Sequence, residues 1–274
     1  MTNSTHLPPP LNAWAESALG PFDDVEDASH DRENSRVWRV TGAAGDHYVK
    51  VAPKPILHTR EVDAYRLAVP RLGHGNAPAL RDSSADLQAL ILTAVDGKPL
   101  NEQASPAHRR SAHQQAGQLL RRFHDAKNGL LIQSDATRVV EDTTAGLDRH
   151  LAEAGDHLSG AEGDLLRRLV SLLPDCGPLP AGLRHGDFWE RNLLWNGQRC
   201  ALIDFERSEP GPRVVDFVKL TTSVWPDHPE LRAALFEGYG RELSATEELA
   251  LTAFAAADAA SALAPTAPST ETPS

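Results

Sequence analysis

The sequence predicts an α+β protein of two lobes, a small β-rich N-terminal lobe and a larger helical C-terminal lobe. Alternating apolar residues and turn glycines dominate the first third of the chain, whereas apolar residues at helical spacing dominate the rest. One short hairpin pattern is embedded among the predicted helices. At 274 residues the chain is long enough for two lobes around a sizeable core.

The first lobe is expected to span residues 13–95. Its expected elements are a strand over 36–40, a strand over 47–51, a helix after Pro55 and a strand over 87–92. The first two strands alternate around a turn with two glycines, which is typical of a β-hairpin. The sequence therefore predicts a sheet with one helix in this lobe.

The second lobe is expected to span residues 96–263. Its expected elements are a helix from Pro106, helical stretches over 141–173 and 229–262, and a hairpin of 192–195 with 200–203. The Asn196-Gly197 pair indicates that hairpin. Outside the lobes, residues 1–12 with three consecutive prolines are expected to be a flexible lead-in. Residues 264–274 are expected to be a disordered tail, because they have little to bury.

Composition excludes several classes of protein. The net charge of −11 argues against a nucleic-acid partner, because phosphate backbones need basic patches. No apolar run is long enough to span a membrane, and the first residues do not form a signal peptide. Two cysteines cannot make a disulfide framework. The expected location is cytoplasmic, and the oligomeric state stays open.

The most informative residues are Asp187, Asn192 and Asp204. Phosphoryl transfer from ATP needs magnesium at the phosphates and a carboxylate at the acceptor hydroxyl. An Asp and an Asn on one tight loop, with a second Asp on the adjacent hairpin arm, bring three oxygen ligands to one point, and oxygen ligands suit magnesium. The order D-x-x-x-x-N, a hairpin, then D-F is that of the catalytic and metal-binding loops of kinases.

With His185-Gly186-Asp187 in place of the His-Arg-Asp of protein kinases, the sequence resembles the aminoglycoside phosphotransferase and choline kinase-like family. That family has a protein-kinase-like fold. Three further segments match, namely 119–124 before the catalytic loop, 90–97 at the interlobe hinge and 214–218 after the metal-binding residue. The resemblance covers roughly residues 30–240.

The resemblance implies an ATP- and Mg²⁺-dependent O-phosphotransferase that moves the γ-phosphate to a hydroxyl of a small molecule. Asp187 would orient that hydroxyl and take its proton, and Asn192 and Asp204 would hold Mg²⁺. Lys50 would contact the α- and β-phosphates, and Glu61 would fix Lys50. GTP remains an alternative to ATP.

Some of these roles have alternatives. Lys50 could be a solvated strand lysine, and Asp63 shares the helix of Glu61. Arg191 could reach the transferring phosphate, or it could be a surface arginine that pairs with Glu190 or Glu209. His185 and Asp216 are interpreted as structural, with Asp216 as a helix cap.

The nucleotide contacts are less well defined. No glycine occurs in residues 29–35, so the loop over the phosphates is not glycine-rich. Asn34 and Ser35 are candidates for phosphate contact, and a simple β-turn is the alternative. The resemblance implies that backbone groups of Thr93 and Val95 meet the adenine.

The acceptor is not given by the fold. The first hypothesis is an aminoglycoside or another antibiotic or natural product, phosphorylated in a resistance-type inactivation, because residues 96–274 carry a net charge of −8. Plain solubility explains that charge equally well. The candidate contacts are Trp189, Glu209, Trp225 and Asp227, with Glu190, Glu206, Glu230 and Glu237 as further acidic groups. They are expected on the second-lobe side of Asp187.

Two alternatives to an antibiotic kinase remain. The first is a metabolite kinase with a sugar, a choline- or ethanolamine-like compound or a homoserine-like compound as acceptor. The second, from another class, is a nucleotide-binding pseudokinase. Because Lys50, Asp187, Asn192 and Asp204 are all present, the sequence argues against the pseudokinase.

Overall fold

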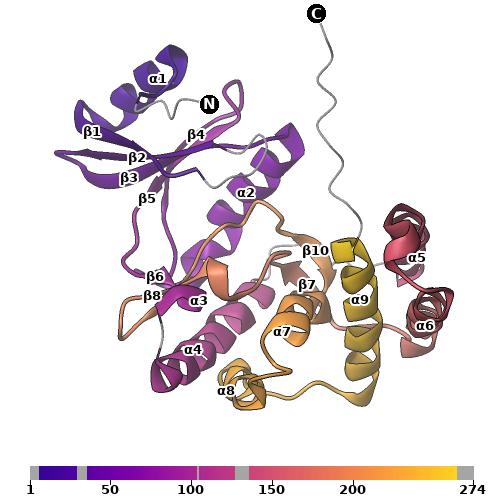
Figure 1. Ribbon diagram of the computed structural model, residues 1–274. Helices are drawn as coiled ribbons and strands as arrows, with labels where there is room; N and C mark the ends of the chain where they lie inside the picture. Colours follow the sequence, from indigo (N-terminus) through magenta and orange to yellow (C-terminus); the bar gives the residue numbers. More distant parts are fainter. Residues whose placement is uncertain (1–5, 30–35, 104, 127–135, 264–274) are drawn as a thin grey trace, which may run out of the picture.

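The computed structural model describes residues 6–29, 36–103, 105–126 and 136–263. Figure 1 shows a sheet flanked by helices from the first part of the chain and a mainly helical body from the rest. The sheet strands are β1 (Phe22–Asp27), β2 (Arg36–Gly42), β3 (Gly45–Val51), β4 (Leu80–Ser84) and β5 (Ala89–Thr93). All neighbours are antiparallel, in the order β1-β2-β3-β5-β4.

The hairpin of β2 and β3 confirms the first sequence prediction. Its ladder runs without a bulge from Arg36 opposite Val51 to Gly42 opposite Gly45. Gly45 has φ of +89°, a left-handed backbone that residues with a side chain rarely adopt. The tight turn therefore depends on glycine, and it fixes the register that places Lys50 within β3.

The two faces of the sheet pack against different partners. Successive side chains of a strand point to opposite faces, so Val49 and Lys50 of β3 face opposite ways. On the Val49 face, helix α1 (Pro9–Leu19) packs Leu11 and Ala15 against the sheet. The other face carries Lys50 and Leu90, and Leu90 belongs to the main core shared with the second lobe. Lys50 consequently points toward the second lobe.

The predicted flexible lead-in over residues 1–12 is wrong from Leu7 onward. Helix α1 begins at Pro9, because proline fits the first turn of a helix, where its missing N–H is not needed. Leu7 and Leu11 are only 5% and 4% exposed, since both pack against the sheet. The predicted tail, residues 264–274, lies outside the described residues.

Helix α2 (Pro55–Leu67) confirms the helix expected after Pro55 and carries Glu61 into the interior. A 3₁₀ turn, η1 (Val69–Leu72), then leads to β4. Glu61 and Tyr65 lie four residues apart on one face of α2, and both are buried. That face is directed toward Lys50 and the second lobe.

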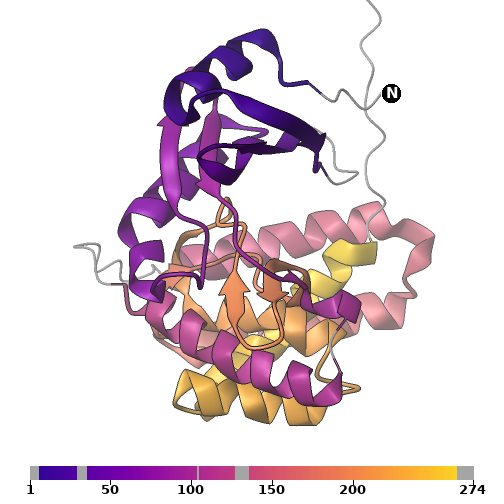
Figure 2. The same cartoon turned by 90° about the vertical axis from the view of Figure 1, so that its left-hand side faces the viewer.

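The second lobe is mainly helical, and Figure 2 shows it below the sheet with short orange strands between them. Its helices are α3 (Leu100–Gln103), α4 (Pro106–His124), α5 (Ala136–Ala154), α6 (Gly160–Val170), α7 (Val218–Ser223), α8 (Pro229–Tyr239) and α9 (Ala245–Leu263). Its 3₁₀ turns are η2 (Gly155–His157), η3 (Leu173–Cys176), η4 (Glu190–Asn192) and η5 (Arg213–Phe217). Its strands are β6 (Lys98–Pro99), β7 (Ala181–Arg184), β8 (Leu193–Trp195), β9 (Cys200–Leu202) and β10 (Glu209–Pro212).

The strands of this lobe form two small sheets that support the loops between them. The order is β6-β8-β9 in one sheet, while β7 pairs with β10 in the other. The β8–β9 pair confirms the hairpin expected around Asn196-Gly197. The helix expected from Pro106 is confirmed as α4.

The two long helical stretches of the prediction each consist of two helices. The first is interrupted before α6, where Ser159 and Glu162 form a reciprocal capping box. The second ends α8 at Gly240, which adopts the left-handed conformation typical of a helix C-cap. Local capping residues therefore overrode a continuous amphipathic pattern.

Helices α4 and α8 pack in very close contact because two glycines face the partner backbone. A Cβ on Gly117 would stand 2.0 Å from the carbonyl oxygen of Leu235. One on Gly238 would stand 1.8 Å from the carbonyl oxygen of Gln114. No larger side chain fits at either position without moving a helix.

One apolar cluster runs through both lobes and includes Tyr65, Leu90, Phe123 and Phe205. The core therefore continues from the sheet into the helical lobe. The division at residues 95 and 96 remains our proposal. Across the ranges that the structure describes, no helix is both long and apolar enough to cross a membrane.

Candidate active site

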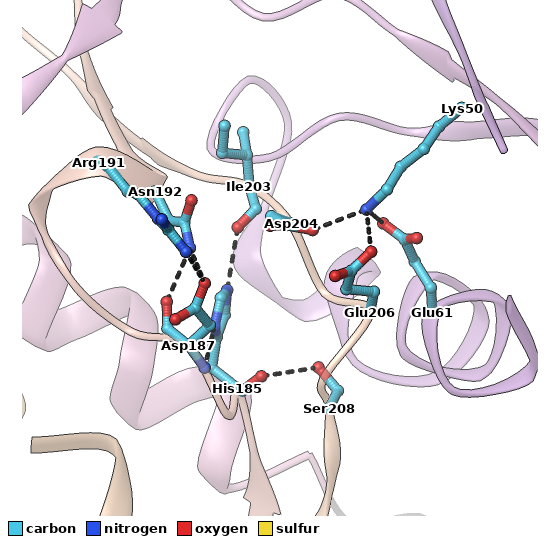
Figure 3. A network of polar contacts seen from close by, with 10 residues as sticks. All are labelled: Lys50, Glu61, His185, Asp187, Arg191, Asn192, Ile203, Asp204, Glu206 and Ser208. Atoms are coloured by element: carbon cyan, nitrogen blue, oxygen red, sulfur yellow. Dashed lines mark hydrogen bonds and ion pairs between the residues drawn. The ribbon is translucent and has the colours of Figure 1, made fainter. Parts of the chain in front are cut away.

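A polar site lies where the sheet meets the second lobe, and it is drawn in Figure 3. Lys50 reaches it from β3 and Glu61 from α2. Asp187 lies on the loop between β7 and η4, and Asp204 follows β9. Residues predicted from distant parts of the sequence thus meet at one place.

Lys50 forms the center of a cluster of carboxylates. Its Nζ lies 3.0 Å from Glu61 Oε1, 2.7 Å from Asp204 Oδ1 and 3.1 Å from Glu206 Oε2. The side chain is 9% exposed, so the alternative of a solvated strand lysine is wrong. Burial alone would lower the pKa of Lys50, but the three carboxylates raise it well above its usual value.

Glu61 is fully buried, and its environment disfavours a negative charge. Burial raises the pKa of Glu61 to about 7, and the charges of Asp204 and Glu206 add to that effect, while Lys50 opposes it. Three carboxylates therefore face a single ammonium group. The cluster carries excess negative charge, which a bound cation would offset.

Asp187 is held by its own loop. Its Oδ2 accepts hydrogen bonds from Arg191 Nη2 at 2.7 Å and from Asn192 Nδ2 at 3.0 Å. Asn192 also donates to the backbone carbonyl of Asp187 at 2.8 Å. Burial raises the pKa of Asp187 above its usual value, and the nearby charge of Asp204 contributes in the same direction.

Asp216 holds the backbone of this loop through hydrogen bonds. Its carboxylate accepts hydrogen bonds from the backbone N–H groups of His185 and Gly186, both at 2.7 Å. His124 Nε2 lies 2.8 Å from the same carboxylate. The predicted capping role of Asp216 is wrong, because its oxygens bind the loop that carries Asp187 and no side chain caps η5 or α7.

His185 ties the two loops of the site together. Its Nε2 lies 3.0 Å from the carbonyl oxygen of Ile203, and its Nδ1 accepts from the N–H of Asp187 at 3.3 Å. Gly186 has φ of +80°, and a Cβ there would stand 2.3 Å from the carbonyl oxygen of Arg207. Only glycine therefore fits between these loops.

The backbone of Asp204 is strained. Its φ is +66°, which is uncommon for a residue with a side chain. The next residue, Phe205, is fully buried and packs at ring-centroid distances of 5.2 Å from Tyr65 and 5.3 Å from Phe123. The anchored phenyl ring and the turned backbone together direct the Asp204 carboxylate toward Lys50.

The donor set fits a hard cation such as Mg²⁺. Asn192 uses its amide nitrogen on Asp187, so its amide oxygen faces elsewhere, and Asp204 supplies a carboxylate. Within the described ranges, no three His, Cys, Asp or Glu side chains form a group that could hold a metal. A cation between Asn192 and Asp204 would therefore need further oxygen ligands, such as nucleotide phosphates.

The predicted nucleotide contacts are only partly accounted for. Thr93 donates its backbone N–H to the carbonyl of Ala79 at 2.9 Å, and its hydroxyl accepts from the N–H of Ala79. The N–H of Thr93 is thus engaged by the chain itself. Val95 follows β5 in the link toward β6. Asn34 and Ser35 lie outside the described residues.

Two of the predicted acceptor contacts do not fit that role. Trp225 is buried, because its ring stacks on Phe217 and packs at a tilt against Phe236 in the core. Glu209 forms ion pairs with Arg60 and Arg184. Its carboxylate joins α2 to the β7–β10 pair and is not free for a ligand.

The other two candidates remain accessible in part. Trp189 is half-buried, and the guanidinium of Arg191 lies 4.3 Å from the center of its ring. Asp227 is exposed. Arg191 pairs with Asp187, so the alternative of a surface pair with Glu190 or Glu209 is wrong.

One residue of the Lys50 cluster was assigned differently from the sequence. Glu206 was a candidate for the acceptor, but it lies beside Lys50 and is 8% exposed. Its position two residues after Asp204 was the available signal. The intervening Phe205 points into the core, so Asp204 and Glu206 can both face the lysine.

A sheet-borne lysine paired with a helix-borne glutamate, opposite an Asp–Asn loop in a helical lobe, defines the class of bilobal, protein-kinase-like phosphotransferases. The chain belongs to the phosphotransferase enzyme family (APH), whose family model matches residues 24–251. Membership confirms the predicted family and the predicted class of enzyme. The particular acceptor is not set by membership.

A curated relative is the N-acetylmuramate/N-acetylglucosamine kinase of Neisseria meningitidis serogroup B (strain ATCC BAA-335 / MC58). It is 24% identical over 218 residues, which make up 77% of this chain and 65% of the relative. The chain thus spans slightly less than two thirds of that kinase.

Solved structures with the same fold include three small-molecule phosphotransferases. A spectinomycin phosphotransferase in complex with ADP and spectinomycin has a TM-score of 0.66 and 14% identity, over 93% of this chain and 85% of that one. A macrolide 2′-phosphotransferase from Brachybacterium faecium has a TM-score of 0.66 and 19% identity, over 93% and 98%. A choline/ethanolamine kinase family protein from Mesorhizobium loti has a TM-score of 0.65 and 18% identity, over 91% and 83%. At these identities the likeness concerns the fold, and the predicted fold is confirmed.

Proposed function

We propose that the protein is an ATP- and Mg²⁺-dependent O-phosphotransferase that transfers the γ-phosphoryl group of ATP to a hydroxyl of a small molecule. The observation that carries this proposal is the convergence of Lys50, Asp187 and Asp204 from both lobes on one site, in which Lys50 and Asp187 are buried and Asp204 is half-buried. Because all the ionic groups required for phosphoryl transfer are present, we do not favour a pseudokinase. A cytoplasmic location is part of the proposal.

Asp187 is the proposed base. Arg191 and Asn192 both donate to its Oδ2, which leaves Oδ1 for the acceptor hydroxyl. Asp187 takes the hydroxyl proton while the acceptor oxygen bonds to the γ-phosphorus, and the bond from that phosphorus to the β–γ bridging oxygen breaks. The raised pKa of Asp187 makes it a stronger base than an exposed aspartate.

Lys50 and the carboxylates around it are proposed to hold the triphosphate. Lys50 would bind the α- and β-phosphates while Glu61 keeps its ammonium in place. Asn192 and Asp204 would hold Mg²⁺, which supplies charge neutralisation on the phosphates. Backbone groups of Val95 and the carbonyl of Thr93 are proposed to meet the adenine.

The charge distribution around Asp187 bears on the acceptor. Glu190, Glu206 and Glu209, which were expected to receive amino groups, each pair with a lysine or arginine of this chain. These pairs leave few carboxylates beside the catalytic loop for a polycationic ligand.

Cations, by contrast, stand close to Asp187. Arg191 contacts its carboxylate, and Arg207 is exposed and near enough to lower its pKa in part. We therefore propose a neutral or anionic sugar as the acceptor, of the N-acetylhexosamine kind named for the Neisseria kinase. N-acetylglucosamine is neutral and N-acetylmuramate carries a carboxylate, and both offer several hydroxyls.

An aminoglycoside is the second candidate acceptor. The net charge of −8 over residues 96–274 and the exposed carboxylate of Asp227 favour it. An aminoglycoside acceptor would make the enzyme one of resistance-type inactivation. Among the described candidates, Asp227, Glu230 and Glu237 keep exposed carboxylates that could receive an amino group.

A phosphorylation screen separates these proposals. The purified protein is incubated with Mg-ATP and N-acetylglucosamine, N-acetylmuramate, kanamycin, spectinomycin, a macrolide or choline, and ADP release and phosphorylated product are measured. Asp187→Ala serves as the inactive control. Product with the N-acetylhexosamines alone supports the first candidate, and product with kanamycin alone supports the second. No Asp187-dependent turnover with any acceptor or with water would contradict the kinase proposal itself.

A further inference from the structure

Glu190 occupies an unusual place beside the proposed active site. It opens the short turn η4 and is 5% exposed, so its carboxylate lies inside the protein. Arg109 donates its Nε to Oε1 at 3.0 Å and its Nη2 to Oε1 and Oε2 at 2.7 and 2.9 Å. His113 Nε2 lies 2.9 Å from Oε1. A buried carboxylate is thereby fully engaged by two side chains.

Both partners come from one helix. Arg109 and His113 are four residues apart on α4, so they lie on the same helical face and clasp Glu190 together. His113 is fully buried, and its Nδ1 has no hydrogen-bond partner within the described residues. Glu190 is therefore the polar contact that orients this imidazole. Although burial would raise the pKa of Glu190, hydrogen bonds from His113 and Arg109 lower it.

The turn anchored in this way carries the groups that hold Asp187. Arg191 and Asn192 directly follow Glu190, and both donate to Asp187 Oδ2. The turn is short, and the N–H of Asn192 donates to the carbonyl of Trp189 at 3.0 Å. Little slack remains between the anchored carboxylate and the two donors. A displacement of Glu190 would shift both donors relative to Asp187.

We propose that Glu190, clasped by Arg109 and His113, is a positioning residue for phosphoryl transfer, which sets η4 so that Arg191 and Asn192 align Asp187. Its role in catalysis rests on the proposed function of Asp187. The same clasp fixes the helix α4 to the catalytic loop, so the alignment is built into the packing of the second lobe. Small errors in such alignment have large effects on rate.

The test compares Arg109→Gln with Arg110→Gln. Arg110 is the next residue on α4 and forms an exposed pair with Glu237, so it is a matched control. In Arg109→Gln, amide hydrogen exchange over residues 187–193 should rise about threefold or more, because Glu190 loses its arginine partner and η4 is then anchored by His113 alone. Magnesium-dependent ATP turnover should fall about tenfold, with the KM for ATP changed by less than about twofold. Arg110→Gln should leave all three readouts unchanged.

A double variant separates positioning from general stability. Arg109→Gln leaves an under-compensated buried carboxylate, whereas Arg109→Gln with Glu190→Gln removes the charge as well. The double variant should therefore turn over ATP at least as fast as Arg109→Gln. Its fold loss of turnover should be smaller than the product of the losses measured for Arg109→Gln and for Glu190→Gln alone. Independent, multiplicative losses would overturn the proposal. So would unchanged exchange over 187–193 and unchanged turnover in Arg109→Gln.

The outcomes also distinguish this inference from the proposed function. If wild-type protein shows no turnover that depends on Asp187, the proposed function fails, and the exchange experiment still decides whether Arg109 anchors η4. If Asp187→Asn abolishes turnover while Arg109→Gln remains fully active when folded, only the positioning role is overturned. A uniform rise of exchange across the lobe, with turnover preserved, would indicate a structural role alone.

Discussion

Lys50 Nζ lies 2.7 Å from Asp204 Oδ1, although 154 residues separate the two in the chain. Lys50 belongs to the sheet, and Asp204 belongs to the loop that follows β9 in the second lobe. The ion pair therefore reports directly on how the lobes face each other. A nucleotide bound between them would compete for the same ammonium group.

We expect the difference in stability between Glu61→Gln and wild type to depend on pH. Burial raises the pKa of Glu61 in the folded protein from 4.5 to about 7, so its favourable contribution is complete below the unfolded value and lost as the pH rises through about 7. Glu61→Gln cannot ionise. Its free energy of unfolding, relative to wild type, should therefore rise by about 2 kcal/mol between about pH 5 and pH 8. Urea unfolding at both pH values measures this change, and a constant difference would contradict it.

Gly117 predicts that a single methyl group disrupts helix packing. Gly117→Ala would bring a Cβ to 2.0 Å from the Leu235 carbonyl oxygen, so it should lower the free energy of unfolding by about 2 kcal/mol or more. Gly146→Ala on α5 is the control, because nothing lies within 4 Å of its Cβ position. That change should stabilise the protein by about 0.5–1 kcal/mol through helix propensity. Equal effects in chemical denaturation would refute the packing argument.

Trp225 predicts a loss of stability and no direct effect on the acceptor. Its ring is buried against Phe217 and Phe236, so Trp225→Ala should cost about 3–5 kcal/mol of unfolding free energy. Asp227→Ala, at an exposed neighbour, should cost little. Denaturation curves and the acceptor KM of both variants provide the check. A large rise in KM for Trp225→Ala with unaltered stability would restore it as a binding residue.

Much of the site was readable from the sequence because its motifs are local. Asp187 and Asn192 lie on one loop, and Asp204 follows the next hairpin, so their spacing carried the prediction. Lys50 was placed by the alternation of one hairpin. Such short-range patterns identify side chains that chemistry requires in a fixed order.

The errors arose where distant segments decide the environment of a residue. Trp225 is buried because Phe236 on α8 covers it, and Asp216 binds the loop of His185, some 31 residues earlier in the chain. No local pattern contains either contact. Leu7 and Leu11 did offer a signal, since their spacing is helical, but three prolines obscured it. Proline stops a helix only beyond its first turn.

We expect Asp204→Ala and Asn192→Ala to reduce the magnesium dependence of ATP binding to different extents. Asp204→Ala removes the anionic ligand, so it should abolish the dependence of ATP binding on Mg²⁺, while Asn192→Ala should weaken it less. Calorimetric titration of ATP at graded Mg²⁺ concentrations measures both. Lys50 contacts Asp204, so Lys50→Met is a useful comparison: it should weaken ATP binding but keep its dependence on Mg²⁺. Unchanged magnesium dependence in Asp204→Ala would contradict the assignment of Asp204 as a ligand of Mg²⁺.

The turnover of Asp187→Asn tests the central claim most directly. Asparagine keeps the size of the side chain and can still accept a hydrogen bond from Arg191, but it cannot take the acceptor proton. Phosphoryl transfer should fall about a hundredfold or more, while the Kd for Mg-ATP changes by less than about twofold. Transfer near the wild-type rate, at unchanged Kd, would contradict the assignment of Asp187 as the base.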